Sequence, residues 1–217
     1  MEITEIFESL QGEGVQMGQP TIFIRLTGCN LRCEWCDTQY AYDNGTEMSI
    51  PEIIEEINKF PGKLICITGG EPLTQPETGE LVDELLNLNY SINLETNGSI
   101  NIDSTLNNHD KILISMDVKC PSSQMESKMD LTNIQYLKST DQLKFIIKDQ
   151  NDYEFAFKIL QENRSNCNII FTPVNGIDLK WLAEKVIEDH TVFSELGLNV
   201  RVLPQLHKLV WGNAKGR

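Results

Sequence analysis

The sequence of 217 residues lacks any apolar run long enough to span a membrane. Its first residues, Met1 to Glu5, lack the basic and apolar regions of a signal peptide, so we expect a cytoplasmic protein. Positive charge is scarce, because 18 Lys and Arg stand against 32 Asp and Glu and the formal net charge is −14. An acidic surface opposes binding to nucleic acid and to anionic membranes. The sequence therefore predicts a small molecule or another protein as the reactant.

Internal repeats, linkers and low-complexity segments are also missing, so we expect one domain over residues 1–217. Short apolar segments alternate with segments of helical periodicity through most of the chain. We expect strands over 21–26, 63–68, 91–95, 111–117, 142–148, 168–171 and 199–203, and helices over 49–60, 77–89, 152–163 and 179–189. This alternation predicts an α/β fold with a parallel sheet. A complete eight-unit barrel would be cramped in this length, so we expect a partial (β/α)6-type barrel of about six strands.

Three of the six cysteines lie in one loop, with the spacing Cys29-x3-Cys33-x2-Cys36, directly after the strand expected over 21–26. The other cysteines and the three histidines show no zinc-finger spacing. Without an export signal, this grouping favours metal ligation over disulfides. A structural zinc site or an ordinary iron–sulfur cluster takes four protein ligands, whereas three thiolates on a four-iron cluster leave one iron open. The alternatives are a zinc knuckle, an electron-transfer module, or buried structural thiols.

Polar motifs follow several of the other expected strands. They are Thr68-Gly69-Gly70-Glu71-Pro72, Glu95-Thr96-Asn97-Gly98, Asp117-Val118-Lys119 and Thr172-Pro173-Val174-Asn175. A parallel barrel brings the loops at the carboxyl ends of its strands to one mouth, so the motifs predict a single site. Glycines at 69 and 70 permit close approach of the backbone to a ligand, and we expect Glu71 to orient that turn.

The cysteine spacing, with Trp35 before the last cysteine, resembles the signature of the radical S-adenosylmethionine (SAM) enzymes. In that superfamily the open iron of a [4Fe-4S] cluster binds the amino and carboxylate groups of SAM, and an electron from the cluster then releases a 5′-deoxyadenosyl radical. The resemblance implies a cluster held by Cys29, Cys33 and Cys36. It implies an electron donor such as a flavodoxin or ferredoxin, and no catalytic side chain, because SAM supplies the radical.

Over nearly its full length the chain is similar to one family, the 7-carboxy-7-deazaguanine synthases. The similarity depends on Phe7-x2-Leu10-Gln11-Gly12-Glu13-Gly14, Arg25, Cys29 to Thr38, the Thr68 and Glu95 motifs, Lys119-x-Pro121-Ser122-Ser123 and Gln205-Leu206-His207-Lys208. It implies a radical SAM barrel that converts 6-carboxy-5,6,7,8-tetrahydropterin into 7-carboxy-7-deazaguanine with release of ammonia. That product feeds the biosynthesis of queuosine or archaeosine in transfer RNA. The alternative is a radical SAM activase that installs a glycyl radical on a protein partner.

The same resemblance assigns roles to individual residues and implies a homodimer. SAM would contact Trp35, Cys36, Asp37, Gly70, Asn97, Asp117, Val118 and Lys119, with a further contact over Thr172 to Asn175. The pterin would contact Leu10, Gln11, Gly12, Glu13, Arg25 and Thr68, and Thr38 would bind Mg²⁺, a cation that prefers oxygen ligands. An arginine within so apolar a strand needs a partner, and we expect Arg25 to hold the substrate carboxylate rather than to be a surface residue.

Overall fold

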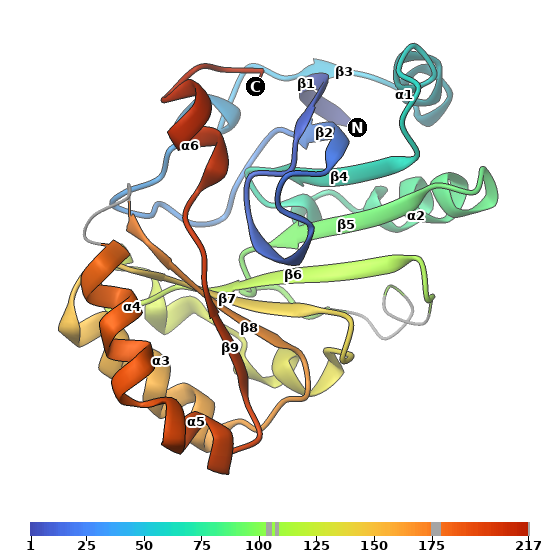
Figure 1. The fold of residues 1–217 in the computed structure, drawn as a ribbon. Helices are drawn as coiled ribbons and strands as arrows, with labels where there is room; N and C mark the ends of the chain where they lie inside the picture. The colour runs from blue at the N-terminus through green and yellow to red at the C-terminus, as the bar shows by residue number, and fades with distance from the viewer. Residues whose placement is uncertain (103–105, 107–108, 175–178, 217) are drawn as a thin grey trace.

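The fold is built on one curved, mostly parallel sheet, and the computed structural model describes residues 1–102, 106, 109–174 and 179–216. The sheet has nine strands in the order β3-β1-β2-β4-β5-β6-β7-β8-β9 (Figure 1). The strands are β1 (Glu2–Leu10), β2 (Pro20–Leu26), β3 (Thr46–Glu47), β4 (Leu64–Gly69), β5 (Ser91–Thr96), β6 (Ile112–Val118), β7 (Gln142–Ile147), β8 (Asn168–Pro173) and β9 (Asn199–Val202). Neighbours from β2 through β9 pair parallel, whereas β1 pairs antiparallel with β2 and with β3.

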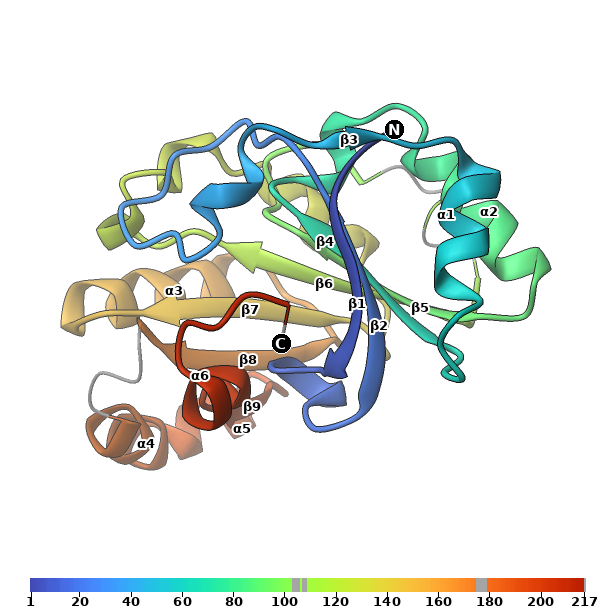
Figure 2. The ribbon, with the colours of Figure 1, turned by 90° about the horizontal axis from the view of Figure 1, so that it is seen from above.

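Helices follow most of the parallel strands and pack on the outer face of the sheet (Figure 2). They are α1 (Ile50–Ile57), α2 (Thr78–Asn87), α3 (Gln150–Glu162), α4 (Leu179–Glu188) and α5 (His190–Glu195). Helix α6 (Leu206–Trp211) instead lies on the concave side, where the amide of Leu206 donates to the carbonyl of Gly12. Helix α1 begins with a capping box, in which Ser49 Oγ accepts from the amide of Glu52 and the Glu52 carboxylate accepts from the amide of Ser49. No described helix is both long and apolar enough to cross a membrane.

The apolar core lies between the helices and the sheet. Side chains alternate along each strand, so one set points out to the helices and the other points into the concave side. The outward set is aliphatic, with Ile65, Ile92 and Ile114 almost fully buried. The inward set is polar, as in Glu95, Asp117 and Lys144 on β5, β6 and β7. The concave side therefore presents the polar side chains that could act on a ligand, while the outer face forms the apolar core that stabilises the fold.

The expected architecture is confirmed, with one difference in the number of strands. Every strand and helix predicted from apolar periodicity is present, and the sheet is open, as a partial barrel requires. The estimate of about six strands was too low, because β1 and β3 extend the sheet beyond β2 on its antiparallel side. Strand β1 is only partly buried, and its repeated Glu residues interrupt the apolar run that marks the parallel strands.

Candidate active site

A cavity of about 600 Å³ opens where the parallel strands end. It is lined by loops that follow β1, β2, β4, β5 and β6, which confirms that the polar motifs meet at one mouth. The residues predicted from the sequence that line it are Leu10, Gln11, Gly12, Glu13, Arg25, Cys29, Cys33, Trp35, Cys36, Asp37, Thr38, Thr68, Gly70, Asn97, Asp117 and Lys119. One cavity thus receives the cysteine loop on one side and the Leu10–Glu13 turn on another.

The cysteine loop is fixed at both ends by backbone hydrogen bonds. The amide of Gly28 donates to the carbonyl of Ala41 at 2.8 Å, and the amide of Glu34 donates to the carbonyl of Ser123 at 3.1 Å. The indole Nε1 of Trp35 donates to Ser122 Oγ at 3.2 Å. The Pro121-Ser122-Ser123 motif therefore supports the loop that carries the thiols, which gives a physical reason for its presence after β6.

The three thiols fit a cluster that offers each of them a separate iron. Cys29, Cys33 and Cys36 are free, partly exposed and line the same cavity. Burial raises the pKa of the Cys29 and Cys33 thiols, so both keep their protons when no metal is bound. A metal that bound these sulfurs would displace the protons. Among the described residues, no group of three His, Cys, Asp or Glu side chains could hold a metal ion. The number of thiols in this loop, three, matches a four-iron cluster with one open iron rather than a structural zinc site with four ligands.

The turn after β4 approaches the cysteine loop so closely that it requires glycine. A Cβ added to Gly70 would lie 1.9 Å from the carbonyl oxygen of Gly28 and 2.9 Å from Cβ of Cys29. Gly69 has φ of 147°, which a residue with a side chain rarely adopts. Any larger residue at position 70 would push this turn away from the thiols.

Glu71 joins that turn to the loop after β5. Its carboxylate accepts hydrogen bonds from the amide of Leu73 at 3.0 Å, from Thr96 Oγ1 at 2.9 Å and from the amide of Asn97 at 2.6 Å. Burial raises the pKa of Glu71, while these three donors favour the ionised form. The expectation that Glu71 orients its turn agrees with these contacts. Asn97 in turn donates through Nδ2 to Asn30 Oδ1 in the cysteine loop at 3.0 Å.

Arg25 has an internal partner that the sequence did not reveal. Its Nε donates to Glu5 Oε1 at 2.7 Å, and the hydroxyl of Tyr40 donates to the same oxygen at 2.8 Å. Glu5 and Arg25 are register partners in the antiparallel pairing of β1 with β2. An arginine in this strand therefore does not need a substrate for charge balance. Its side chain nevertheless lines the cavity, with Glu5 fixing its orientation.

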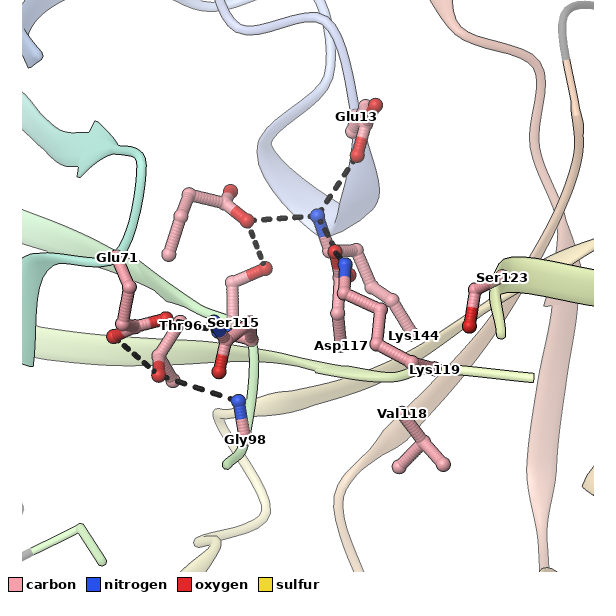
Figure 3. A network of polar contacts seen from close by, with 12 residues as sticks. Glu13, Glu71, Thr96, Gly98, Ser115, Asp117, Val118, Lys119, Ser123 and Lys144 are labelled. Atoms are coloured by element: carbon pink, nitrogen blue, oxygen red, sulfur yellow. Dashed lines mark hydrogen bonds and ion pairs between the residues drawn. The ribbon is translucent and has the colours of Figure 1, made fainter. Parts of the chain in front are cut away.

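A network of charged groups forms the floor of the cavity around Lys144 (Figure 3). The ammonium group lies 2.8 Å from Glu13 Oε2, 2.7 Å from Glu95 Oε2 and 3.2 Å from Asp117 Oδ1. Asp117 also pairs with Lys119 at 2.8 Å. Burial alone would raise the pKa of Glu13, but Lys144, a hydrogen bond from Gln205 and the nearby His207 lower it to about 2. Glu13 is thus a fixed carboxylate at the cavity wall.

The C-terminal segment closes one side of the cavity against the Leu10–Glu13 turn. The amide of Leu206 donates to the carbonyl of Gly12 at 2.8 Å, and Gln205 Nε2 donates to Glu13 Oε1 at 2.7 Å. The ring of His207 occupies the space where a side chain at Gly12 would lie. In Figure 1 this red segment leaves β9 and reaches α6 near the N-terminal strands.

The same segment contacts the end of the cysteine loop. Lys208 Nζ lies 2.8 Å from Asp37 Oδ2, and Thr38 Oγ1 donates to Asp37 Oδ1 at 2.9 Å. Although burial would raise it, the pKa of Asp37 is lowered because Lys208 and Thr38 stabilise the carboxylate. The hydroxyl oxygen of Thr38 keeps lone pairs for a cation while its hydrogen points to Asp37.

Two predicted contacts take part in this arrangement less than expected. Val118 has a buried side chain that is not part of the cavity lining and points away from the charged network in Figure 3. Only its backbone could approach a ligand. In the Thr172 to Asn175 stretch, Val174 lines the cavity, whereas Asn175 lies outside the described residues.

Several cavity residues were not predicted from the sequence. They include Tyr40 and Lys144. Glu95 belongs to a motif that was expected at the mouth, and Gln205 and His207 belong to the C-terminal motif of the family resemblance, but none of the three was assigned a role. A signal existed for Glu95 and Lys144, because polar residues alternate with Leu94, Leu143 and Phe145 in strands that are otherwise buried. The resemblance pointed to Gln205, but its contact with Glu13, across most of the chain length, could not be predicted from the sequence.

Comparison with known proteins agrees with this geometry. The sequence model of the Radical SAM superfamily matches residues 23–174. The 7-carboxy-7-deazaguanine synthase of Thermoplasma acidophilum is 38% identical over 216 residues, covering 100% of both chains. The enzyme of the same name from Methanospirillum hungatei is 38% identical over 97% of this chain and 85% of its own. The crystal structure of QueE from Escherichia coli superposes with a TM-score of 0.73 at 21% identity, covering 93% of each chain, and shares the fold.

Proposed function

The chain belongs to the 7-carboxy-7-deazaguanine synthase family of radical SAM enzymes, and we propose on this premise how its cavity carries out the family reaction. The substrate is 6-carboxy-5,6,7,8-tetrahydropterin, and the products are 7-carboxy-7-deazaguanine and ammonia. The observation that carries the proposal is the meeting of the cysteine loop and the Leu10–Glu13 turn in one cavity. One wall can thus hold the cofactor while another reads the substrate.

The cofactors of this family are a [4Fe-4S] cluster and SAM. When bound together, they supply the radical that takes a hydrogen atom from C6 of the substrate. Cys29, Cys33 and Cys36 would hold the cluster through their thiolates and would leave one iron without a protein ligand, available to SAM. The protein residues themselves bind, orient and exclude water, and none of them serves as the hydrogen-abstracting group.

The cysteine loop and the turns after β4 and β5 would hold SAM. The Gly69-Gly70 turn has no side chain in the way, so its backbone can meet the amino group of SAM. Asn97 is held by Glu71 and Asn30 and offers an amide to the ribose hydroxyls. Trp35, Asp37 and the backbone from Asp117 to Lys119 complete the SAM contacts.

The pterin lies against the Leu10–Glu13 turn. Arg25 has its Nε committed to Glu5, and its terminal nitrogens hold the substrate carboxylate. Each oxygen of the Glu13 carboxylate already accepts one hydrogen bond and has a further lone pair for the N–H groups of the pterin edge. The backbone of Leu10 to Gly12 and the Thr68 hydroxyl add shorter polar contacts.

Magnesium completes the site at Thr38. The hydroxyl oxygen, with water and the substrate, suits a cation that prefers oxygen and keeps part of its hydration shell. A Mg²⁺ ion held by Thr38 would supply positive charge beside the substrate. Asp37 orients this hydroxyl and is itself held by Lys208.

The setting of the reaction is also part of the proposal. The protein acts as a homodimer in the cytoplasm and receives electrons from a small donor such as a flavodoxin or ferredoxin. The product enters 7-deazapurine biosynthesis for queuosine or archaeosine. The activase alternative is not favoured, because the relatives that match the whole chain are synthases of a small molecule.

Anaerobic turnover tests the proposed function. Cluster-loaded protein, SAM, a chemical reductant and 6-carboxy-5,6,7,8-tetrahydropterin are combined, and the deazapurine and ammonia are quantified, the former by mass spectrometry. We expect both products in equal amounts, with SAM regenerated. Cleavage of SAM without loss of the pterin would contradict the assignment.

A further inference from the structure

Lys144 connects three carboxylates that come from three different parts of the fold. Glu13 lies in the turn after β1, Glu95 on β5 and Asp117 at the end of β6, and each lies within 3.2 Å of the ammonium group. The side chain of Lys144 is only 3% exposed. A buried ammonium group is tolerated only with close, well-aligned partners, so the lysine and its carboxylates stabilise each other's charges.

The local charge in this network does not balance. Three carboxylates, Glu13, Glu95 and Asp117, face two ammonium groups, Lys144 and Lys119, which leaves one excess negative charge. Removal of either cation would leave buried carboxylates unpaired, and the least costly response is protonation of one of them. Besides these groups, His207 faces Glu13 from the C-terminal segment.

The backbone of the Glu13 turn is held independently of Lys144. The amide of Val15 donates to Gln142 Oε1 at 2.7 Å, and the carbonyl of Gly12 accepts from the amide of Leu206 at 2.8 Å. Gln205 also reaches the other oxygen of Glu13. Lys144 is therefore the largest of the contacts that favour the charge of Glu13, ahead of Gln205 and His207, while the backbone contacts set the position of the turn.

We propose that Lys144 is a positioning residue that keeps Glu13 ionised and directs its free lone pairs into the cavity. Glu13 would then accept hydrogen bonds from neighbouring N–H groups at one edge of the substrate. This identification of the ligand rests on the proposed function. The ionisation itself does not, because it follows from the protein contacts alone. Without Lys144, the pKa values of both Glu13 and Glu95 rise, and we expect Glu13 to take up a proton, which converts an acceptor into a donor.

Infrared spectroscopy of the cluster-loaded protein tests the ionisation directly. At about pH 5, Lys144→Met should show a carboxylic acid C=O band beyond those of the wild type, and Lys144→Met/Glu13→Gln should lack it. Lys144→Arg keeps the charge and should show no new band. An unchanged Lys144→Met spectrum, or a new band that survives Glu13→Gln, would overturn the proposal.

A second variant keeps the test valid if Lys144→Met does not fold. Lys144→Met/Glu95→Gln leaves two carboxylates and one ammonium group, which preserves the excess of one negative charge. Replacing a buried ion pair with neutral side chains is often tolerated. The same new band should appear in this variant at about pH 5, and its absence from a folded protein contradicts the proposal.

Kinetics then separate positioning from a general structural role. Lys144→Met should lower kcat/KM for the pterin about tenfold to a hundredfold, mainly by raising KM. The kcat/KM of this variant should recover as pH rises, because Glu13 ionises again. The KM for SAM should stay near its wild-type value, and the exposed control Lys158→Met should change nothing. If kcat fell by the same factor as kcat/KM and neither depended on pH, the positioning role of Lys144 would be overturned. If the wild type leaves the pterin unchanged, the proposed function fails while the infrared test of Lys144 still stands.

Discussion

The amide of Asn97 donates to the carboxylate of Glu71 at 2.6 Å, across 26 residues of sequence. This contact joins the turn after β4 to the loop after β5, because Glu71 also accepts from Thr96 Oγ1 and from the amide of Leu73. Asn97 extends the connection to Asn30 in the cysteine loop. Three loops that line the side of the cavity proposed for SAM are thus held in one arrangement by a single buried carboxylate.

The substitution Glu71→Gln should weaken SAM binding. The amide nitrogen would bring a donor to a position surrounded by donors, so at least one buried N–H would lose its acceptor, at a cost of about 1–3 kcal/mol in the free energy of unfolding. We expect the KM for SAM to rise about tenfold while the iron content stays unchanged. Urea unfolding and SAM-dependent kinetics measure these effects, with the exposed α2 variant Glu80→Gln as the control. A wild-type KM for SAM in a correctly loaded variant would count against the role of Glu71.

Much of this arrangement could be predicted from the sequence. The apolar runs of β4 to β8 located the parallel strands, and the cysteine spacing located the loop that follows β2. Because parallel strands end at one edge, the motifs after them could be assigned to one site without coordinates. The chemistry of the site could thus be predicted from types of residue and their order along the chain.

The contacts between motifs could not be predicted in the same way. The pairing of Glu5 with Arg25 depends on the antiparallel register of β1, a strand whose glutamates hide its apolar pattern. Asp117 meets Lys144 through the register of β6 with β7. Gln205 reaches Glu13 only because the C-terminal segment returns across the cavity. The register of strand pairing and the path of the C-terminal segment are properties of the tertiary structure, and local sequence patterns do not specify them.

The substitution Arg25→Lys should weaken binding of the pterin selectively. Lysine retains the charge but loses the planar group that can contact Glu5 and a carboxylate at the same time. We expect kcat/KM for the pterin to fall about tenfold to a hundredfold, with the KM for SAM and the cluster unaffected. Steady-state kinetics with each substrate varied in turn provide the measurement, and the exposed β9 variant Arg201→Lys is the control. Unchanged kinetics would remove Arg25 from the substrate site.

The contribution of Glu13 to stability should depend on pH. Its pKa in the folded protein is about 2, below the ordinary value of 4.5, so its stabilising effect is complete above 4.5 and is lost as pH falls toward 2. The difference in free energy of unfolding between wild type and Glu13→Gln should therefore be larger at about pH 6 than at about pH 3. Urea unfolding of cluster-free protein at these pH values measures it. A difference that does not change with pH would show that Glu13 is not held as a carboxylate.

Magnesium should accelerate turnover through Thr38. Thr38→Val keeps the shape of the side chain but removes the oxygen, so the response to Mg²⁺ should be largely lost while SAM binding persists. The measurement is the turnover rate with Mg²⁺ against the rate in a chelator that does not strip iron, for both proteins. Thr46→Val, on the exposed strand β3, is the matched control. Equal rates with and without Mg²⁺ in the wild type would make Thr38 a bystander.

The central claim is that Cys29, Cys33 and Cys36 hold a four-iron cluster whose remaining iron is open to SAM. Electron paramagnetic resonance of the reduced cluster, recorded before and after addition of SAM, tests it most directly. We expect SAM to change the spectrum in the wild type and in Cys66→Ala, whose thiol lines the cavity but lies outside the loop, and Cys36→Ala to lose the four-iron signal. A four-iron signal that SAM leaves unchanged, or one that survives Cys36→Ala with full iron content, would contradict the account.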